Sequence, residues 1–301
     1  MKNLLRPNII IPLAVFLAAR LAAHFMAIES QCYGGWTAEC WSRWDSGLYL
    51  QIAEQGHNLI PCPDWPGAWC GNAGWAPLYP LLIKAFTTLG ADAAQSGLWL
   101  SQIFFFGLLL VAAKLWDVRD FSARNWLGLI IVGFAPGSIY FQALFPVSLV
   151  VFLLMLLHYF LEKEQYLSAG ICGFLAVLSY SGGVFLLICL ALWGLMQWVK
   201  HKTFPWQMAL KTGIITFSGM LIWWGYDAYA TGHWNAMFLI QQKYGHGLHS
   251  PLKHFGMHLK ILFGNSWGMK SWVEVQNLII MMGVVAMTIW ILLRRKMDFS
   301  A

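Results

Sequence analysis

Long apolar runs recur along the chain and are separated by short polar segments. A run of about 17–25 mostly apolar residues is long enough to cross the ~30 Å hydrocarbon core of a bilayer as a helix. We place eight such spans at residues 7–28, 96–116, 126–142, 147–161, 166–181, 183–199, 209–227 and 274–293. The pattern predicts an all-α, polytopic helical membrane protein that forms a single integral-membrane domain over residues 1–301.

The composition agrees with a membrane protein. Hydrophobic residues make up 59% of the chain, charged residues make up 11%, and the mean hydropathy is +0.59. A typical soluble domain has about a quarter charged residues. The stretch WAPLYPLLIKAFTTLG, residues 75–90, is also apolar, but it is short, contains prolines and carries Lys84. We expect it to be an interfacial or re-entrant helix and not a ninth span.

Lysine and arginine divide unevenly between the two ends of these spans. With 75–90 at the membrane surface, one face collects Lys2, Arg6, Lys114, Arg119, Arg124, Lys163, Lys200, Lys202, Lys211, Arg294, Arg295 and Lys296. The other face collects Arg43, Lys84, Lys243, Lys253, Lys260 and Lys270, and Arg20 falls inside the first span. Short loops rich in lysine and arginine face the cytoplasm. We therefore predict a bacterial inner-membrane protein with both termini in the cytoplasm and with outer loops at 29–95 and 228–273.

The N-terminus also loosely fits a secretory signal peptide, because it begins with basic residues and includes AHFMA near residue 25. Its apolar run is longer than the apolar region of a typical signal peptide and is interrupted by Arg20, which favours a retained span. The net charge of +6 is concentrated on the predicted cytoplasmic face. This placement indicates attraction to anionic lipids and not nucleic-acid binding.

Four of the six cysteines fall within residues 29–74. Cysteines on the outer face of a bacterial membrane can pair oxidatively. The equally spaced pairs Cys32–Cys40 and Cys62–Cys70 are the simplest of the three connectivities that four cysteines allow. Four reduced thiols, or a zinc ion held by four thiolates, are the alternatives, although the C-x2-4-C spacing typical of zinc sites is absent.

Only the outer loops 29–95 and 228–273 are long enough to hold a chemical site, whereas the inner loops are short connectors. A catalytic site would therefore face outward, with loop 29–95 as the catalytic loop. Nucleotide sugars and ATP are cytoplasmic, so they are excluded as direct substrates. A substrate delivered through the lipid fits this arrangement, and membrane lipids are expected partners.

The stretch RWDSGLYLQIAEQGH, residues 43–57, places an aspartate directly after Trp44. The spacing of the apolar residues that follow predicts a helix lying on the membrane, with Asp45 at or near its start. Aspartate is a favoured N-cap residue, where its side chain stabilises a helix by about 1 kcal/mol. Capping is therefore one interpretation of Asp45.

The same stretch resembles the first-loop signature of bacterial relatives of the PIG-V mannosyltransferases, a branch of the GT-C superfamily. The matching residues are Trp44, Asp45, Ser46, Tyr49, Ile52, Ala53 and Gly56, with His57 where the family usually has tyrosine. Two weaker blocks follow in the expected order. WAPLYPLLIKAF resembles the family's Phe-x-Pro-Leu-Tyr-Pro-Leu segment through Pro77, Leu78, Tyr79 and Pro80. YDAYATGHWNAMFLIQQKYGHG resembles the family's Tyr-x-x-x-Thr-Gly-Asp-Pro…Gln-x-x-Trp segment through Thr231, Gly232, Gln241 and Tyr244.

The sequence departs from the family at three positions. Val147 stands where the family has glutamate, Tyr180 where it has arginine, and His233 where it has aspartate. Because buried charges need partners, loss of both the glutamate and the arginine of an intramembrane pair would be tolerable for the fold. The same losses leave open a diverged, non-catalytic subunit of a membrane glycosylation complex.

The resemblance implies a GT-C-like fold and a metal-independent enzyme. Such an enzyme transfers a sugar, mannose by family precedent, from a polyprenyl-phosphate donor to an acceptor hydroxyl on a glycan, lipid or protein, with inversion. The attack needs a base at the hydroxyl, which typically contributes about 10²–10⁴-fold to the rate. Asp45 is the candidate base. No cofactor is required, because the sugar–phosphate bond is already activated.

The departing phosphate and the sugar need hydrogen-bond donors or positive charges. Our candidates for binding the donor or another substrate are Arg20, Arg43, Trp44, Ser46, Tyr49, Tyr79, Lys84, Gln241, Lys243, Tyr244 and His246. An arginine within a span usually lines a cavity or pathway, and snorkelling to the interface is the alternative for Arg20. A role as loop anchors is the alternative for Gln241 and Tyr244.

Two other functions, metal binding and transport, fit the sequence less well. His254 and His258 have the spacing of a metal-binding pair on one helical face, but no carboxylate lies nearby and no metal site is predicted. A carrier or flippase for a lipid-linked or small substrate is the rival class. The sequence lacks evident inverted repeats and paired broken helices, which transporters often have.

Overall fold

The computed structural model describes residues 6–29, 32, 37–135, 137–243 and 251–264, and the isolated residues 275, 278, 279, 282, 283 and 286. The chain divides into two units, residues 1–245 and 246–301. The second unit contains the helix α14 (Pro251–Gly264). The remaining helices and the two strands with described bounds belong to the first unit.

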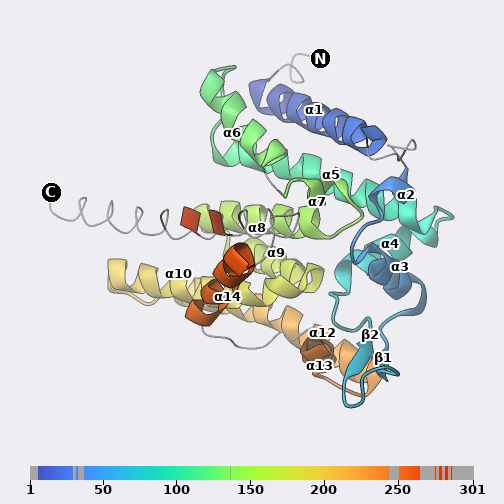
Figure 1. Cartoon of the computed structure of the whole chain (residues 1–301). Coiled ribbons are helices and arrows are strands. Elements are labelled where there is room, and N and C mark those ends of the chain that lie inside the picture. The colour runs from blue at the N-terminus through green and yellow to red at the C-terminus, as the bar shows by residue number, and fades with distance from the viewer. Residues whose placement is uncertain are drawn as a thin grey trace. The chain divides into compact units, whose positions relative to one another are not determined.

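The first unit is mostly helical (Figure 1). Among the described residues, three helical stretches are long and apolar enough to cross a membrane: α1 (Pro7–Glu29), α5 (Ala93–Leu115), and the stretch formed by η1 (Ser181–Val184) with α10 (Phe185–His201). Four shorter helices are also apolar: α4 (Leu78–Thr87), α6 (Ala123–Phe134), α8 (Val147–Glu162) and α9 (Tyr166–Ser179). A mostly helical protein with membrane-length apolar helices is confirmed, whereas the number of spans stays a prediction.

The helices follow the predicted apolar runs except in one place. The run 126–142 was expected to be a single span, but α6 ends at Phe134 and α7 (Ile139–Gln142) is separate. Ala135, which precedes Pro136, is already extended with a ψ of 151°, as is favoured before proline, and Gly137 follows with a φ of +94°. The one-helix prediction for 126–142 is therefore wrong. The run 274–293 lies outside the described residues apart from isolated positions.

The last long helical stretch of the first unit is continuous from residue 206 to residue 231. It comprises α11 (Trp206–Met208), the π-helical turn η2 (Ala209–Ile214) and α12 (Ile215–Thr231). Gly232, with a φ of +76°, ends it by donating its N–H to the carbonyl of Ala228. The short helix α13 (Ala236–Lys243) follows.

The helices pack in a simple succession. Helix α1 lies against α5 and α6, α5 lies against α8, α8 against α9, and α9 against α12 (Figure 1). Small residues allow the close approach of α9 and α12. A Cβ added to Gly219 of α12 would lie 2.8 Å from the carbonyl oxygen of Phe174 in α9. Such small residues at helix contacts are typical of membrane helix packing.

Short elements gather at one end of this helical stack (Figure 1). They are α2 (Ala38–Trp41), α3 (Ser46–Gln55), the hairpin of β1 (Leu59–Pro61) and β2 (Trp69–Gly71), and α4. The strands are antiparallel, with Leu59 opposite Gly71 and Pro61 opposite Trp69. Disulfides join Cys32 to Cys40 and Cys62 to Cys70, which is the connectivity expected from the spacing.

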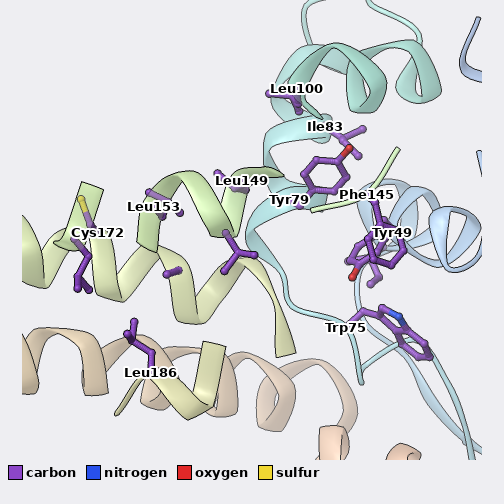
Figure 2. Packing of buried hydrophobic residues seen from close by; sticks show 14 of the residues in the cluster. Tyr49, Trp75, Tyr79, Ile83, Leu100, Phe145, Leu149, Leu153, Cys172 and Leu186 are labelled. Atoms are coloured by element: carbon purple, nitrogen blue, oxygen red, sulfur yellow. The ribbon is translucent and has the colours of Figure 1, made fainter. Parts of the chain in front are cut away.

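Helix α3 is seated on the largest buried cluster of the protein. Tyr49 of α3 meets Tyr79 of α4 and Phe145, with ring centroids 5.7 Å and 5.4 Å apart, both edge to face. Figure 2 shows these three rings grouped together beside Ile83. Aromatic pairs in this geometry stabilise a core beyond their area burial. The core therefore fixes the helix that directly follows Asp45.

Candidate functional site

Asp45 directly precedes α3, as the sequence predicts, but its side chain does not cap the helix. Only its backbone carbonyl is used there, accepting from the N–H groups of Leu48 and Tyr49 at 2.9 and 3.2 Å. Within the described part of the chain, no hydrogen bond or ion pair reaches the Asp45 carboxylate. The residue is partly buried. Its carboxylate is therefore not committed to the structure of the helix.

Trp44 has an unusual backbone conformation, with a φ of +52°. A left-handed conformation costs a non-glycine residue about 1–2 kcal/mol, and retained strain of this kind clusters at functional sites. The side chain is 58% exposed, and its ring centroid lies 4.5 Å from that of Tyr140. Trp44 thus presents a large aromatic surface beside Asp45 at an energetic cost to the fold.

Aromatic side chains from three stretches of the chain pack on one another next to Asp45. We call them the aromatic collar: Trp44, Tyr49, Tyr140, Phe145 and Tyr180. Phe145 is central, with its ring centroid 5.4 Å from Tyr49, 5.6 Å from Tyr140 and 6.3 Å from Tyr180.

The negative charge of Asp45 acts on the phenol groups of both Tyr49 and Tyr180, so the carboxylate lies near both. Burial, followed by the neighbouring Tyr180, Asp45 and Tyr79, raises the pKa of Tyr49 well above its usual value. Tyr49 is therefore neutral at physiological pH. Tyr180, which stands where the family has arginine, places a neutral group beside Asp45 and not a cation.

Ser46 anchors the Asp45 turn to a distant segment. Its hydroxyl lies 2.8 Å from the carbonyl oxygen of Leu144 and accepts from the Arg43 N–H at 2.9 Å. The Leu144 N–H donates in turn to the carbonyl of Trp41 at 3.0 Å. Ser46 is 1% exposed and holds the turn in place, and its role in substrate binding stays a prediction.

Two neighbouring cavities are lined in part by α1, and we call them the α1 cavities. The first, of about 370 Å³, is lined by Met26, Ala27, Cys40, Trp41, Arg43, Trp44 and Ile139. The second, of about 250 Å³, shares Met26 and Ile139 and is otherwise lined by α1 and by the segment 133–142. Both linings are mainly apolar, and the predicted donor-binding residues Arg43 and Trp44 belong to the lining of the first cavity.

Arg20 is buried within α1 at 7% exposure. Its guanidinium donates to the side-chain oxygen of Gln142 at 3.4 Å and lies 5.4 Å from the ring centroid of Trp41. Gln142 and Trp41 each line one of the α1 cavities. The arginine is therefore held between protein partners beside these cavities and does not snorkel to an exposed position.

Of the other predicted substrate-binding residues, Tyr79 packs on Tyr49 of the collar, with ring centroids 5.7 Å apart. Tyr79 is fully buried, and its hydroxyl donates to the carbonyl of Gly97 at 2.7 Å, which gives it a packing role. Lys84 is exposed on α4, and Gln241 lies beside Gly74. Lys243 ends α13, and its ammonium lies 3.2 Å from the sulfur of Cys70 in the hairpin. Tyr244 and His246 lie outside the described residues.

The three departures from the family occupy different surroundings. Val147 begins α8 and packs against the main core, and Tyr180 belongs to the collar. The ring of His233 packs on Trp69 of the hairpin at 5.0 Å. Among the described residues, no group of three His, Cys, Asp or Glu side chains is arranged to hold a metal ion.

Sequence reasoning missed one buried ion pair. His57 Nδ1 lies 2.6 Å from Asp227 Oδ1, and both side chains are 0% exposed. In the sequence, His57 stands out only because the resembling family has tyrosine there, and Asp227 is the last residue of the predicted span 209–227. A signal was present, because an aspartate inside an apolar run needs a partner, but nothing local identifies that partner.

Comparisons with known proteins add no relative. No family model, curated protein or solved structure matches this chain. The resemblance to PIG-V relatives therefore stays a prediction based on the residues of the three blocks, and the functional argument depends on the site itself.

Proposed function

We propose that this protein is a GT-C-type glycosyltransferase that moves a sugar, with mannose favoured, from a polyprenyl-phosphate donor to an acceptor hydroxyl. In this proposal eight helices span a bacterial inner membrane, both termini are cytoplasmic, and the collar faces outward. The observation that carries it is the uncommitted carboxylate of Asp45, held beside an exposed, strained tryptophan and next to apolar cavities flanked by arginines.

Asp45 is the proposed general base. Its carboxylate takes the proton of the acceptor hydroxyl as the hydroxyl oxygen attacks the anomeric carbon of the donor. The bond between that carbon and the phosphate oxygen breaks, and the polyprenyl phosphate leaves with the bonding electrons. Attack from the face opposite the phosphate inverts the configuration. Because Tyr180 is neutral, no cation of the collar pairs with the base.

The surroundings of Asp45 suit the two halves of the donor. The α1 cavities, lined by residues such as Met26, Ala27 and Ile139, are suited to an isoprenoid chain. Arg43, in the lining of the first cavity, and Arg20, which donates to Gln142 in the lining of the second, are suited to stabilising the departing phosphate by charge-assisted hydrogen bonds. The exposed ring of Trp44 offers a surface on which the sugar can stack.

The test is transfer from a polyprenyl-phosphate sugar in membranes that contain the protein. Asp45→Asn is expected to lower the transfer rate by about 10²–10⁴-fold, the usual contribution of a positioned base. Glu54→Gln is the matched control, because Glu54 is an exposed carboxylate on the same helix, and its transfer is expected to be unchanged. Full activity of a folded Asp45→Asn variant would remove the base assignment.

The same assay separates the rival functions. Movement of the lipid-linked substrate across the membrane without a new covalent product would favour a carrier or flippase. Transfer that depends on a second protein and is indifferent to Asp45 would favour a non-catalytic subunit, which is the alternative suggested by Val147 and Tyr180.

A further inference from the structure

The buried His57–Asp227 pair joins two segments that lie 170 residues apart in the sequence. Helix α3 ends at Gly56, whose φ of +78° turns the chain and whose N–H bonds back to the carbonyl of Ile52. His57 follows immediately, and its Nδ1 meets the Asp227 carboxylate of α12 at 2.6 Å. The pair therefore lies at the C-terminal end of the helix that Asp45 begins.

Tyr226, the residue before Asp227 in α12, also contacts His57. Its ring centroid is 4.8 Å from that of His57, and its hydroxyl oxygen lies 3.4 Å from the His57 backbone nitrogen. A Cβ added to Gly56 would lie 3.2 Å from this hydroxyl, so the end of α3 is packed closely on α12. The end of α3 is therefore held on α12 by several contacts and not by a single hydrogen bond.

Polar side chains connect the C-terminal end of α3 to the hairpin. Asn58 and Asn72 each accept the backbone N–H of the other, at 3.0 and 2.7 Å. The Asn72 amide also donates to the carbonyl of Gly56 and to the side chain of Gln51, both at 3.2 Å. Helix α3, the hairpin and residue 72 therefore form one hydrogen-bonded block, and the pair attaches this block to α12.

The pair is enclosed and does not face a substrate. Both side chains are 0% exposed, and neither His57 Nε2 nor Asp227 Oδ2 has a hydrogen-bond partner within the described part of the chain. A base must reach the proton that it removes. Ionisable groups buried this deeply persist when they pair with each other, so their effect is on structure.

We propose that the His57–Asp227 pair is a positioning device that fixes the C-terminal end of α3 to α12 and thereby sets the place of Asp45 at the other end. Ser46 holds the first turn of α3 against Leu144. The helix, about 15 Å long at 1.5 Å per residue, is therefore attached to the rest of the protein at both ends. The effect on catalysis rests on the proposed function, whereas the attachment of α3 does not.

Hydrogen exchange followed by mass spectrometry on the purified full chain tests the attachment. In Asp227→Leu, the amides of residues 48–56 are expected to exchange about tenfold faster or more, the effect of losing a hydrogen bond to a charged group. Asp227→Asn keeps an oxygen that accepts from Nδ1–H and should retain most of the protection. Asp64→Asn, at the exposed tip of the hairpin, is the matched control and should exchange like the unchanged protein.

A double variant protects this test from simple misfolding. His57→Phe combined with Asp227→Leu removes both polar groups, so neither is left buried and alone, and it is expected to recover much of the protection lost in the single variants. Single-variant effects that merely add in the double variant would contradict the pairing. Unchanged exchange of residues 48–56 in Asp227→Leu, or an equal rise throughout α8 and α9, would overturn the positioning role.

Transfer measured on the same preparations separates this inference from the proposed function. Faster α3 exchange together with a fall in kcat and a smaller change in KM would support positioning of the base. Faster exchange with unchanged kcat would overturn it. If the unsubstituted protein transfers no sugar, the proposed function fails while the exchange result still decides whether the pair holds α3.

Discussion

The side chains next to the two ends of α3 differ in their exposure and in whether they have bonding partners. At the N-terminal end, the Asp45 side chain makes no capping bond and Trp44 is 58% exposed in a strained conformation. At the C-terminal end, His57 and Asp227 are 0% exposed and lie 2.6 Å apart. At one end the carboxylate has no bonding partner in the described structure, whereas at the other end the polar groups are paired and buried.

The largest difference between the two ends should appear in stability. His57→Ala leaves the Asp227 carboxylate buried without its partner, so the free energy of unfolding should fall by about 3–5 kcal/mol. Asp45→Ala removes a carboxylate that bonds nothing in the described structure, and the change should stay within about 0.5 kcal/mol. Chemical unfolding in detergent measures both. Equal losses in the two variants would contradict the division of roles.

A smaller effect is expected from the hairpin bridge next to the C-terminal end. Replacing Cys62 and Cys70 together by serine should lower the free energy of unfolding by about 2–3 kcal/mol, because the closed loop no longer restrains the unfolded chain. Cys189→Ser is the control, since this cysteine is free and exposed, and its effect should be close to zero. A loss in the control as large as in the double variant would show that the bridge itself contributes nothing.

The smallest effect concerns the backbone of Trp44. Trp44→Gly and Trp44→Ala both remove the ring, but only glycine relieves the left-handed φ of +52°. The glycine variant should therefore be more stable than the alanine variant by about 1 kcal/mol. At Glu54, in the last turn of α3, the order should reverse, because glycine is less favourable than alanine in a helix. The same order at both sites would argue against strain at Trp44.

Local pattern was sufficient for much of the fold. The apolar runs predicted α1, α5, α8 and α9 closely, and the spacing after Trp44 predicted a helix that begins beside Asp45. The one-helix prediction for 126–142 failed because it followed apolar composition alone and did not use the Pro136-Gly137 dipeptide, which is typical of a turn. The hairpin 59–71 was not predicted either, because strands of three residues carry too little alternation to be recognised.

The candidate site was only partly visible in the sequence. Trp44, Asp45 and Tyr49 lie within one short stretch, and their proximity follows from helical spacing. Tyr140 and Phe145 come from a distant segment and were not singled out, because ring contacts across the fold have no local signature. The pairing of Asp227 with His57 was not predicted, because the two residues lie 170 positions apart in the sequence.

Both disulfides have a consequence for how the protein is made. Each joins cysteines only eight positions apart, so each ring is complete once a short stretch of chain has emerged from the ribosome and reached an oxidising compartment. Neither ring has to wait for α5 or any later helix. The redox state of these thiols in freshly synthesised chains should therefore report on which side of the membrane this stretch was delivered, independently of whether the rest of the protein has assembled.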